Sequence, residues 1–416
     1  PATDGITDRL QALFAYDASS PLIFSSGLFL FLFAGFLLVY SVFRRAPMAR
    51  IVYVIAFSLY FYYKSSGIYF LLLVFAAASD FLIARGIYRA RFRWTKRWLV
   101  VLSVAVNLGM LGYFKYTNFL IDISNQLFGQ GFLQFQNIFL PVGISFFVFQ
   151  SMSYTIDIYR GQLKPLSNWL DYLFYLSFFP QLVAGPIVRA RDFIPQIRQN
   201  PVVVTREMFG TGVFLILTGL FKKAIISDYI SLNFVDRIFD EPLLYSGFEC
   251  LAGIYGYALQ IYCDFSGYSD MAIGIALLLG FRFPKNFDAP YKSATITEFW
   301  RRWHISLSSW LRDYLYISLG GNRKGKLRTY GNLLVTMVLG GLWHGAAIRF
   351  ILWGTLHGVA LALHKLWMAV VPGAKATGAQ MHWWSRAAGV FFTFNLVCLG
   401  WLMFRAESMQ TVELML

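Results

Sequence analysis

Residues 22–43 read LIFSSGLFLFLFAGFLLVYSVF, and this stretch contains no charged side chain. A helix needs roughly 20 apolar residues to cross the bilayer core, so the stretch predicts a membrane span. Similar apolar segments recur along the chain at 51–63, 68–83, 98–114, 138–158, 170–184, 208–220, 248–279, 332–347, 350–366 and 387–404. The second and third segments are short, and we expect interfacial Tyr and Lys residues to complete them.

The composition agrees with a membrane protein. Of the 416 residues, 57% are hydrophobic, 19% are aromatic and 14% are charged, whereas soluble domains carry roughly 45–50% apolar and about 25% charged residues. This excludes an ordinary soluble globular protein and a disordered chain. We predict an all-α fold, a polytopic membrane helical bundle with re-entrant or broken helices and interfacial amphipathic helices. The lone cysteines Cys250, Cys263 and Cys398 predict buried apolar side chains and no disulfide framework or metal site.

The organisation along the chain is simple. Residues 1–21 form a polar N-terminal segment, and residues 22–416 show no internal repeat and no linker, so we expect one transmembrane domain. The net charge is +15, and the basic residues cluster between the apolar segments, mainly at 85–97 and 282–330. The sequence shows no nucleic-acid-binding module. Under the positive-inside rule both basic regions are cytoplasmic, which places the N-terminus outside.

Two segments predict departures from simple spans. Residues 178–192, FFPQLVAGPIVRARD, contain two prolines and a glycine, which predict a broken helix. Basic residues on both sides of 170–184 favour a re-entrant or buried segment over a full crossing. Residues 299–311 place aromatic and aliphatic side chains near helical spacing within the basic region, which predicts an interfacial helix.

Histidines and acids in apolar surroundings are the candidates for chemistry. His344 lies in LGGLWHGA at 339–346, where a proton-transfer role and a helix-packing role are equally compatible with the sequence. Arg301, Arg302 and His304 could grip a phosphorylated donor at the cytoplasmic face or simply face lipid headgroups. We expect His357 to pack, Asp264 and Asp270 to join helices or form a proton path, and His364 and His382 to lie at the surface.

Several other motifs are excluded. Residues 320–327, GGNRKGKL, approach a phosphate-binding loop, but Leu327 stands where Ser or Thr would bind Mg²⁺. A basic surface loop is therefore expected. The sequence contains no HExxH or GxSxG motif and no Cys–His pair, which removes zinc peptidases and nucleophile-elbow hydrolases.

The region from 297 to 344 resembles the signature region of the membrane-bound O-acyltransferases. It is most similar to the bacterial branch that acetylates exported polysaccharides such as alginate. Supporting blocks are LPVGISFF (140–147), SYTIDIYR (153–160), AGP (184–186), YCDFSGYSDM (262–271) and WLRDYLYISLGGNR (310–323). The resemblance covers roughly residues 22–406, whereas relatives continue beyond Ala406, which indicates that a final helix is missing.

The resemblance implies specific roles and partners. It implies that His344 is catalytic and that His304 is a second functional histidine. Candidate substrate-binding residues are Arg301, Arg302, Trp303, Trp343, Asp264 and Asp270. The implied donor is a cytoplasmic acyl thioester, acetyl-CoA, with no bound cofactor or metal.

The implied location is the bacterial inner membrane. The implied partners are membrane lipid and an extracytoplasmic acetyl-accepting transferase or glycan. Two alternatives stay open from the sequence: D-alanyl transfer to teichoic acid, and a proton-coupled transporter or flippase.

Overall fold

The computed structural model describes residues 13–371 and 382–416 and is helical, with no strand in these two ranges. The chain divides into two compact units. Unit 1 is Pro1–Leu217 with Asp270–Phe283, and unit 2 is Thr218–Ser269 with Pro284–Leu416. Every candidate histidine belongs to unit 2.

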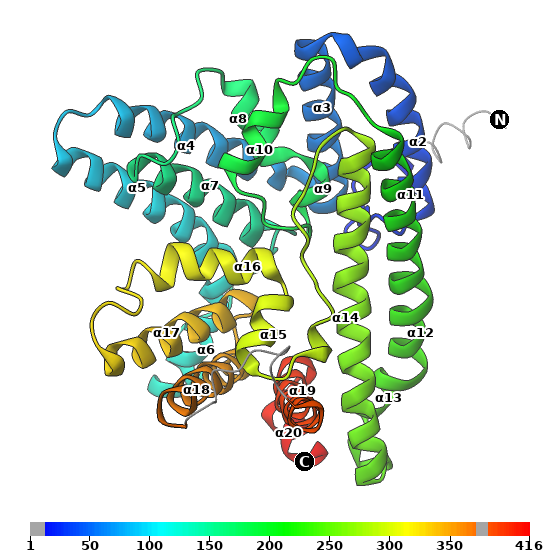
Figure 1. Ribbon diagram of the computed structural model, residues 1–416, viewed down its shortest axis with the longest axis vertical. Coiled ribbons are helices and arrows are strands. Elements are labelled where there is room, and N and C mark those ends of the chain that lie inside the picture. The colour runs from blue at the N-terminus through cyan, green and yellow to red at the C-terminus, as the bar shows by residue number, and fades with distance from the viewer. Residues whose placement is uncertain (1–12, 372–381) are drawn as a thin grey trace. The chain divides into compact units, whose positions relative to one another are not determined.

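Unit 1 consists of membrane-type helices and one broken segment (Figure 1). Its helices are α2 (Gly27–Val42), α3 (Pro47–Ser66), α4 (Phe70–Arg89), α5 (Arg93–Leu111), α6 (Thr117–Phe128), α7 (Ile144–Tyr159), α8 (Trp169–Ser177), α9 (Phe179–Leu182), α10 (Ala190–Ile197) and most of α11 (Arg206–Leu220).

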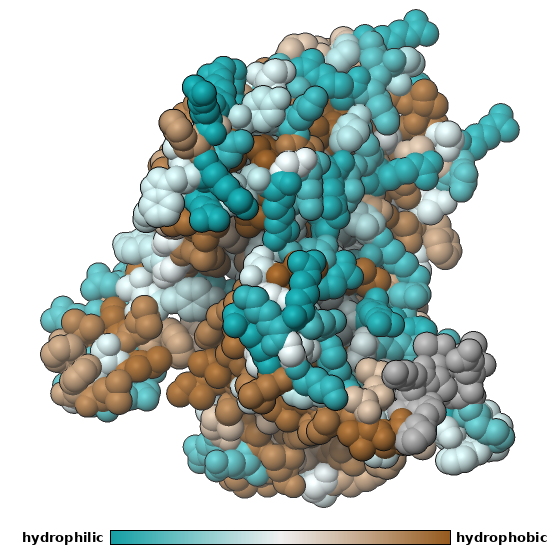
Figure 2. Space-filling model, turned by 60° about the vertical axis from the view of Figure 1, so that its left-hand side comes forward, coloured by the Kyte–Doolittle hydropathy of each residue, from teal (hydrophilic) through white to brown (hydrophobic). Residues whose placement is uncertain are grey.

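The described residues contain five helical stretches that are long and apolar enough to cross a membrane. They are Gly27–Arg45, Pro47–Arg89, Arg93–Phe128, Arg206–Asp240 and Trp383–Arg405. Large apolar side chains remain exposed along them, for example Phe31 at 82% and Val42 at 76%. Brown hydrophobic residues accordingly cover broad areas of the face in Figure 2. The chain is therefore a multi-pass membrane protein.

Helices α3 and α4 extend beyond the apolar segments 51–63 and 68–83. Each has 20 residues, about the length that a bilayer crossing needs. The expected completion by Tyr and Lys holds for α3, which continues through Tyr63 and Lys64. Arg50 is fully buried, and its guanidinium donates to the carbonyls of Ile197 and Gln199 at 3.2 and 2.7 Å.

The predicted break in residues 178–192 is confirmed. Helix α8 ends at Ser177, α9 is a single turn, and irregular backbone leads to α10. Close backbone contacts explain two glycines here. A Cβ on Gly185 would lie 2.5 Å from the Pro180 carbonyl oxygen, and one on Gly143, where φ is +77°, would lie 2.3 Å from the Leu182 carbonyl oxygen.

Unit 2 begins at Thr218 with the end of α11 and continues through a π-helical stretch, Phe221–Ser227, into α12 (Asp228–Ile230) and α13 (Asp236–Asp240). It also contains the first part of α14 (Gly247–Leu278). Its remaining helices are α15 (Ile296–Arg302), α16 (Ile305–Trp310), α17 (Lys326–His344), α18 (Ile348–Val370), α19 (Trp383–Arg405) and α20 (Met409–Met415). The three cysteines are buried and unbridged, as predicted. Residues 322–328 are exposed and form the expected surface loop and the start of α17.

Helices α17 and α18 form a hairpin that brings two backbones into direct contact (Figure 1). A Cβ on Gly341 would lie 2.1 Å from the Phe350 carbonyl oxygen, and one on Gly354 would lie 2.4 Å from that of Met337. Only glycine permits this approach. Gly341, three residues before His344, thus serves helix packing.

Candidate active site

His304 lies in a sharp turn where the sequence predicted a continuous helix. Helix α15 ends at Arg302 and α16 begins at Ile305, so the expected interfacial helix over 299–311 is split. The His304 backbone has a φ of +41°, a conformation that residues other than glycine seldom adopt. Periodicity could not reveal this turn, because the apolar residues keep helical spacing on both sides of it. Strained backbone of this kind concentrates at functional sites.

The turn fixes the chemical form of the His304 ring. The Leu307 backbone N–H donates to Nδ1 at 3.4 Å and caps α16. Since Nδ1 accepts, the neutral ring carries its proton on Nε2. His304 is 1% exposed, and its Nε2 has no hydrogen-bond partner among the described residues. Burial, with a smaller contribution from the nearby His344, holds the pKa of His304 well below its usual value. The ring is therefore a neutral donor at physiological pH.

Asn286 holds the turn in place. Its backbone carbonyl accepts from the Ile305 N–H at 2.9 Å, and its side-chain Oδ1 accepts from both the N–H and the hydroxyl of Ser306. The amide Nδ2 donates to the Ser269 hydroxyl at 3.1 Å. With 1% exposure, Asn286 is a buried clamp on the backbone beside His304. Sequence analysis missed it, since it lies outside every motif examined.

His344 is the last residue of α17, at the tip of the α17–α18 hairpin. The sequence placed it inside a span over 332–347, but the helix ends at His344 and α18 starts at Ile348. The ring is half-buried. It lies edge-on to Trp343, Trp353 and Phe404, with centroids 4.9, 5.2 and 5.2 Å away.

Trp343 connects the two histidines. Its ring centroid is 6.2 Å from that of His304 and 4.9 Å from that of His344. Phe265 closes the other side of His304 at 4.6 Å. Aromatic rings thus pack against both imidazoles, and the fully buried His304 ring is shielded from water.

A third histidine lies deeper in the same unit. His357 is fully buried among Phe299, Trp300 and Trp353, with ring centroids 4.7 to 6.3 Å away. The expected packing role is confirmed. Within the described residues, neither of its nitrogens has a hydrogen-bond partner, and the same holds for the indole nitrogens of Trp300 and Trp353.

The structure places the predicted binding residues Arg301, Arg302 and Trp303 in three different environments. Trp303 is 3% exposed and packs against Trp401 at 4.8 Å, so it is a core residue. Arg302 forms an ion pair with Glu298 at 2.7 Å. Arg301 instead lines a cavity of about 510 Å³.

That cavity lies beside the His304 turn. Its wall includes Trp300 and Ile305, and its basic side chains are Arg301, Arg312 and Lys365. The polar lining also includes Thr297, Ser308, Ser309, Tyr316, Asn322 and Thr336. Arg312 is paired with the Asp313 carboxylate at 2.7 Å, and Lys365 donates to Asn322 Oδ1 at 2.7 Å. The volume lies within the range of small-molecule sites. Three basic side chains and no carboxylate among the lining residues favour an anionic ligand.

The remaining candidates have separate surroundings in the structure. Asp264 on α14 forms a 2.7 Å ion pair with Lys223, so it joins two helical segments, as expected. Asp270 lies six residues further along α14 and belongs to unit 1. His364 was expected at the surface but is half-buried, with Nδ1 2.8 Å from the Thr297 hydroxyl. His382 is exposed, as expected.

Comparison with known proteins gives consistent results. The family model for the membrane-bound O-acyltransferase family matches residues 161–405. The probable alginate O-acetylase AlgI of Pseudomonas aeruginosa is 42% identical over 397 residues, covering 94% of this chain and 73% of that protein.

Two other relatives carry different names. The peptidoglycan O-acetyltransferase of Helicobacter pylori is 36% identical over 419 residues, covering 94% of this chain and 78% of that protein. The teichoic acid D-alanyltransferase of Bacillus subtilis is 29% identical over 287 residues, covering 65% of this chain and 70% of that protein. The family match and the extent of these similarities lead to one conclusion: the chain belongs to the membrane-bound O-acyltransferase family and is a membrane acyltransferase.

Proposed function

We propose that the protein transfers an acetyl group from cytoplasmic acetyl-CoA to a hydroxyl acceptor on the outer side, for O-acetylation of an exported polysaccharide such as alginate. The observation that carries the mechanism is the His304 turn. This turn buries the His304 Nε2–H without a hydrogen-bond partner. The Trp343 ring packs against both His304 and His344 and so brings the two imidazoles close together. A buried donor of this kind suits a charge that exists only during reaction.

In this mechanism His344 is the general base. Its imidazole accepts the proton of the acceptor hydroxyl while the oxygen attacks the thioester carbonyl carbon. The carbon–sulfur bond then breaks, and the imidazolium returns the proton to the departing thiolate. General-base assistance of this type contributes typically 10²- to 10⁴-fold. The carbonyl end of α17, at which His344 lies, stabilises the imidazolium formed on the way.

His304 supplies the oxyanion donor. Its Nε2–H donates to the thioester oxygen as negative charge develops there, and its neutral state keeps that proton available. The sequence alone offered no residue for this role. Trp343 and Phe265 keep the ring dry, which strengthens the hydrogen bond.

The basic cavity is the proposed donor site. Arg301, Arg312 and Lys365 would contact the phosphates of the donor, while Trp300 and Ile305 lie on the side of the His304 turn. The proposed location is the bacterial inner membrane, with residues 282–330 cytoplasmic and the N-terminus outside. The proposed partner is an extracytoplasmic transferase or glycan that receives the acetyl group. No cofactor is proposed.

The relative from Bacillus subtilis supports one alternative, transfer of a D-alanyl group from a carrier-protein thioester. The two are separated by presenting purified protein with acetyl-CoA and with a D-alanyl carrier thioester, and measuring thiol release. We expect release from acetyl-CoA that is lost in His344→Ala. If thiol is released only from the carrier thioester, the D-alanyl carrier protein and not acetyl-CoA is the donor.

The topology has its own test. A membrane-impermeant maleimide should fail to label Lys324→Cys in intact cells and should label it once the membrane is permeabilised. Labelling in intact cells would place residues 282–330 outside and reverse the proposed direction of transfer.

A further inference from the structure

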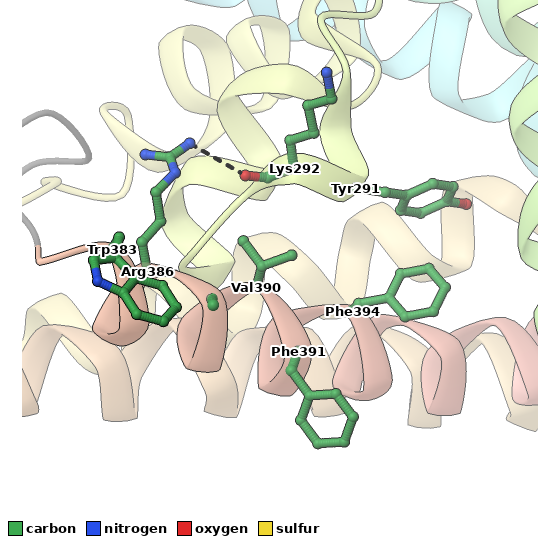
Figure 3. Close-up of a pocket in the computed structure, with 8 residues that line it drawn as sticks. Tyr291, Lys292, Trp383, Arg386, Val390, Phe391 and Phe394 are labelled. Carbon is green, nitrogen blue, oxygen red and sulfur yellow. Dashed lines mark hydrogen bonds between the residues drawn. The ribbon is translucent and has the colours of Figure 1, made fainter.

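A second cavity lies at the start of α19, apart from the residues assigned to catalysis. Its volume is about 610 Å³, and Tyr291, Lys292, Trp383, Arg386, Ala387, Val390, Phe391 and Phe394 line it. Figure 3 shows Arg386, Val390 and Phe394 on the side of α19 that faces Tyr291 and Lys292. The groove thus runs along the first turns of a helix that is long and apolar enough to cross a membrane.

The groove has a cationic end. Arg386 donates one N–H to the Lys292 carbonyl oxygen at 3.5 Å, which leaves its other donors for a ligand. In the described residues neither Arg386 nor Lys292 forms an ion pair. Arg386 is nevertheless half-buried and not extended into solvent. An anion is the missing partner.

The rest of the groove is apolar. The Tyr291 hydroxyl is used internally, because it donates to the Ala258 carbonyl oxygen at 2.6 Å and accepts from the Trp401 indole at 3.1 Å. Only its ring is left for the groove. Phe394 lies edge-on to that ring at 5.3 Å. From Arg386 to Phe394 the helix rises about 12 Å, so an anionic group at one end can continue into an apolar chain.

The surroundings indicate a lipid as the source of that anion. Trp383 is 75% exposed and is the first residue of the candidate span Trp383–Arg405. Tryptophan at such a position marks the membrane interface. We infer that this groove binds an anionic phospholipid, with the phosphate on Arg386 and an acyl chain along Val390 and Phe394.

The test is lipid binding by the purified protein, measured by native mass spectrometry with phosphatidylglycerol and phosphatidylcholine. We expect phosphatidylglycerol to bind more tightly. Arg386→Gln should weaken it about fivefold, the effect of one cation near an anionic surface. Arg386→Lys should retain most of the binding. Val390→Trp, which fills the groove without changing charge, should weaken binding as well.

The matched control is Arg93→Gln. Arg93 is an exposed cation at the start of α5, next to an exposed tryptophan, Trp94, but no groove residue surrounds it. Its replacement should leave phosphatidylglycerol binding unchanged. Equal losses in Arg93→Gln and Arg386→Gln, or full binding by Val390→Trp, would overturn the inference in favour of general surface attraction. Full competition by glycerol phosphate would overturn it in favour of a headgroup-only site.

Discussion

Two clusters of polar side chains are buried in apolar helices, one in each unit, and they differ in how their hydrogen bonds are satisfied. In unit 1 Asp80 is fully buried, and both of its carboxylate oxygens accept. The Ser103 hydroxyl donates to Oδ1 at 2.7 Å, and the Asn107 amide and Ser151 hydroxyl donate to Oδ2 at 2.6 and 2.5 Å. Ser151 also contacts the Tyr172 hydroxyl. The network joins α4, α5, α7 and α8.

The cluster in unit 2 is arranged in the opposite way. His304 Nε2, both nitrogens of His357, and the indole nitrogens of Trp300 and Trp353 have no hydrogen-bond partner in the described chain. In the Asp80 cluster one atom, Asn107 Oδ1, also lacks a hydrogen-bond partner. A buried donor without a partner costs about 1–3 kcal/mol. The satisfied polar groups of the Asp80 cluster join helices, whereas in the proposed mechanism the thioester oxygen supplies the partner that the His304 Nε2–H lacks.

The first prediction concerns His344, where we expect the largest effect. His344→Ala should lower the turnover number by at least 10²-fold, since a general base typically supplies 10²- to 10⁴-fold. The midpoint of thermal unfolding should change little, because the ring is half-buried at a hairpin tip. Single-turnover acetyl transfer and a thermal scan measure both quantities. Full activity would return His344 to helix packing.

The second prediction separates capping from catalysis at His304. His304→Asn should keep the left-handed backbone, which Asn tolerates, and its Oδ1 can accept from the Leu307 N–H in place of Nδ1. It lacks the Nε2–H, so we expect the turnover number to fall 10²- to 10³-fold.

The sequence suggested a donor-binding role for His304, which would instead raise the KM for the acyl donor. His304→Gln, whose amide can reach toward the Nε2 position, serves as the control and should recover part of the turnover number. A change confined to KM would assign His304 to donor binding and contradict the oxyanion role.

The third prediction concerns the satisfied cluster. Asp80→Leu removes the acceptor for three buried donors and should lower the free energy of unfolding by about 2–4 kcal/mol. Activity per folded molecule should stay near wild type, because Asp80 takes no part in the proposed chemistry. Denaturation in mild detergent and titration of folded enzyme check this. An activity loss without a stability loss would show that a satisfied cluster can also be functional.

The fourth prediction concerns the clamp. Asn286→Leu removes the acceptor for Ser306 and should lower the turnover number about tenfold through displacement of the His304 ring, with the KM for the donor little changed. Asn286→Asp keeps that acceptor and should retain more activity. Equal losses in the two variants would point to general destabilisation.

The sequence predicted the features that depend on composition and on long motifs. Apolar segments without charges gave the membrane fold, and the prolines and glycine of 178–192 gave the broken helix. It could not predict that α3 begins before Arg50, because the buried guanidinium finds carbonyl partners from a distant segment. Such pairing is set by tertiary structure.

The candidate site could be predicted only in part, because its geometry also depends on tertiary contacts. Trp303 and Arg301 are near neighbours in sequence, but one lies in the core and the other lines the basic cavity. The left-handed turn at His304 and the clamp by Asn286 depend on contacts between segments 17 to 20 residues apart. Asp80 and Asp264 look alike in sequence, as single acids in apolar helices. Only their partners distinguish a hydrogen-bonded network from an ion pair.

The smallest expected effect is that of His382→Ala, the control for the other histidine variants. His382 is exposed before α19, with its ring 5.7 Å from that of Trp384. Its backbone carbonyl accepts from the Arg386 N–H at 3.0 Å, but its imidazole forms no hydrogen bond within the described residues. Surface substitutions of this kind usually change stability by less than about 0.5 kcal/mol. Acetyl transfer and the unfolding midpoint should therefore match wild type. A loss comparable to that of His344→Ala would mean that removal of any histidine impairs the enzyme, and the contrast between satisfied and unsatisfied clusters would then lose its explanatory value.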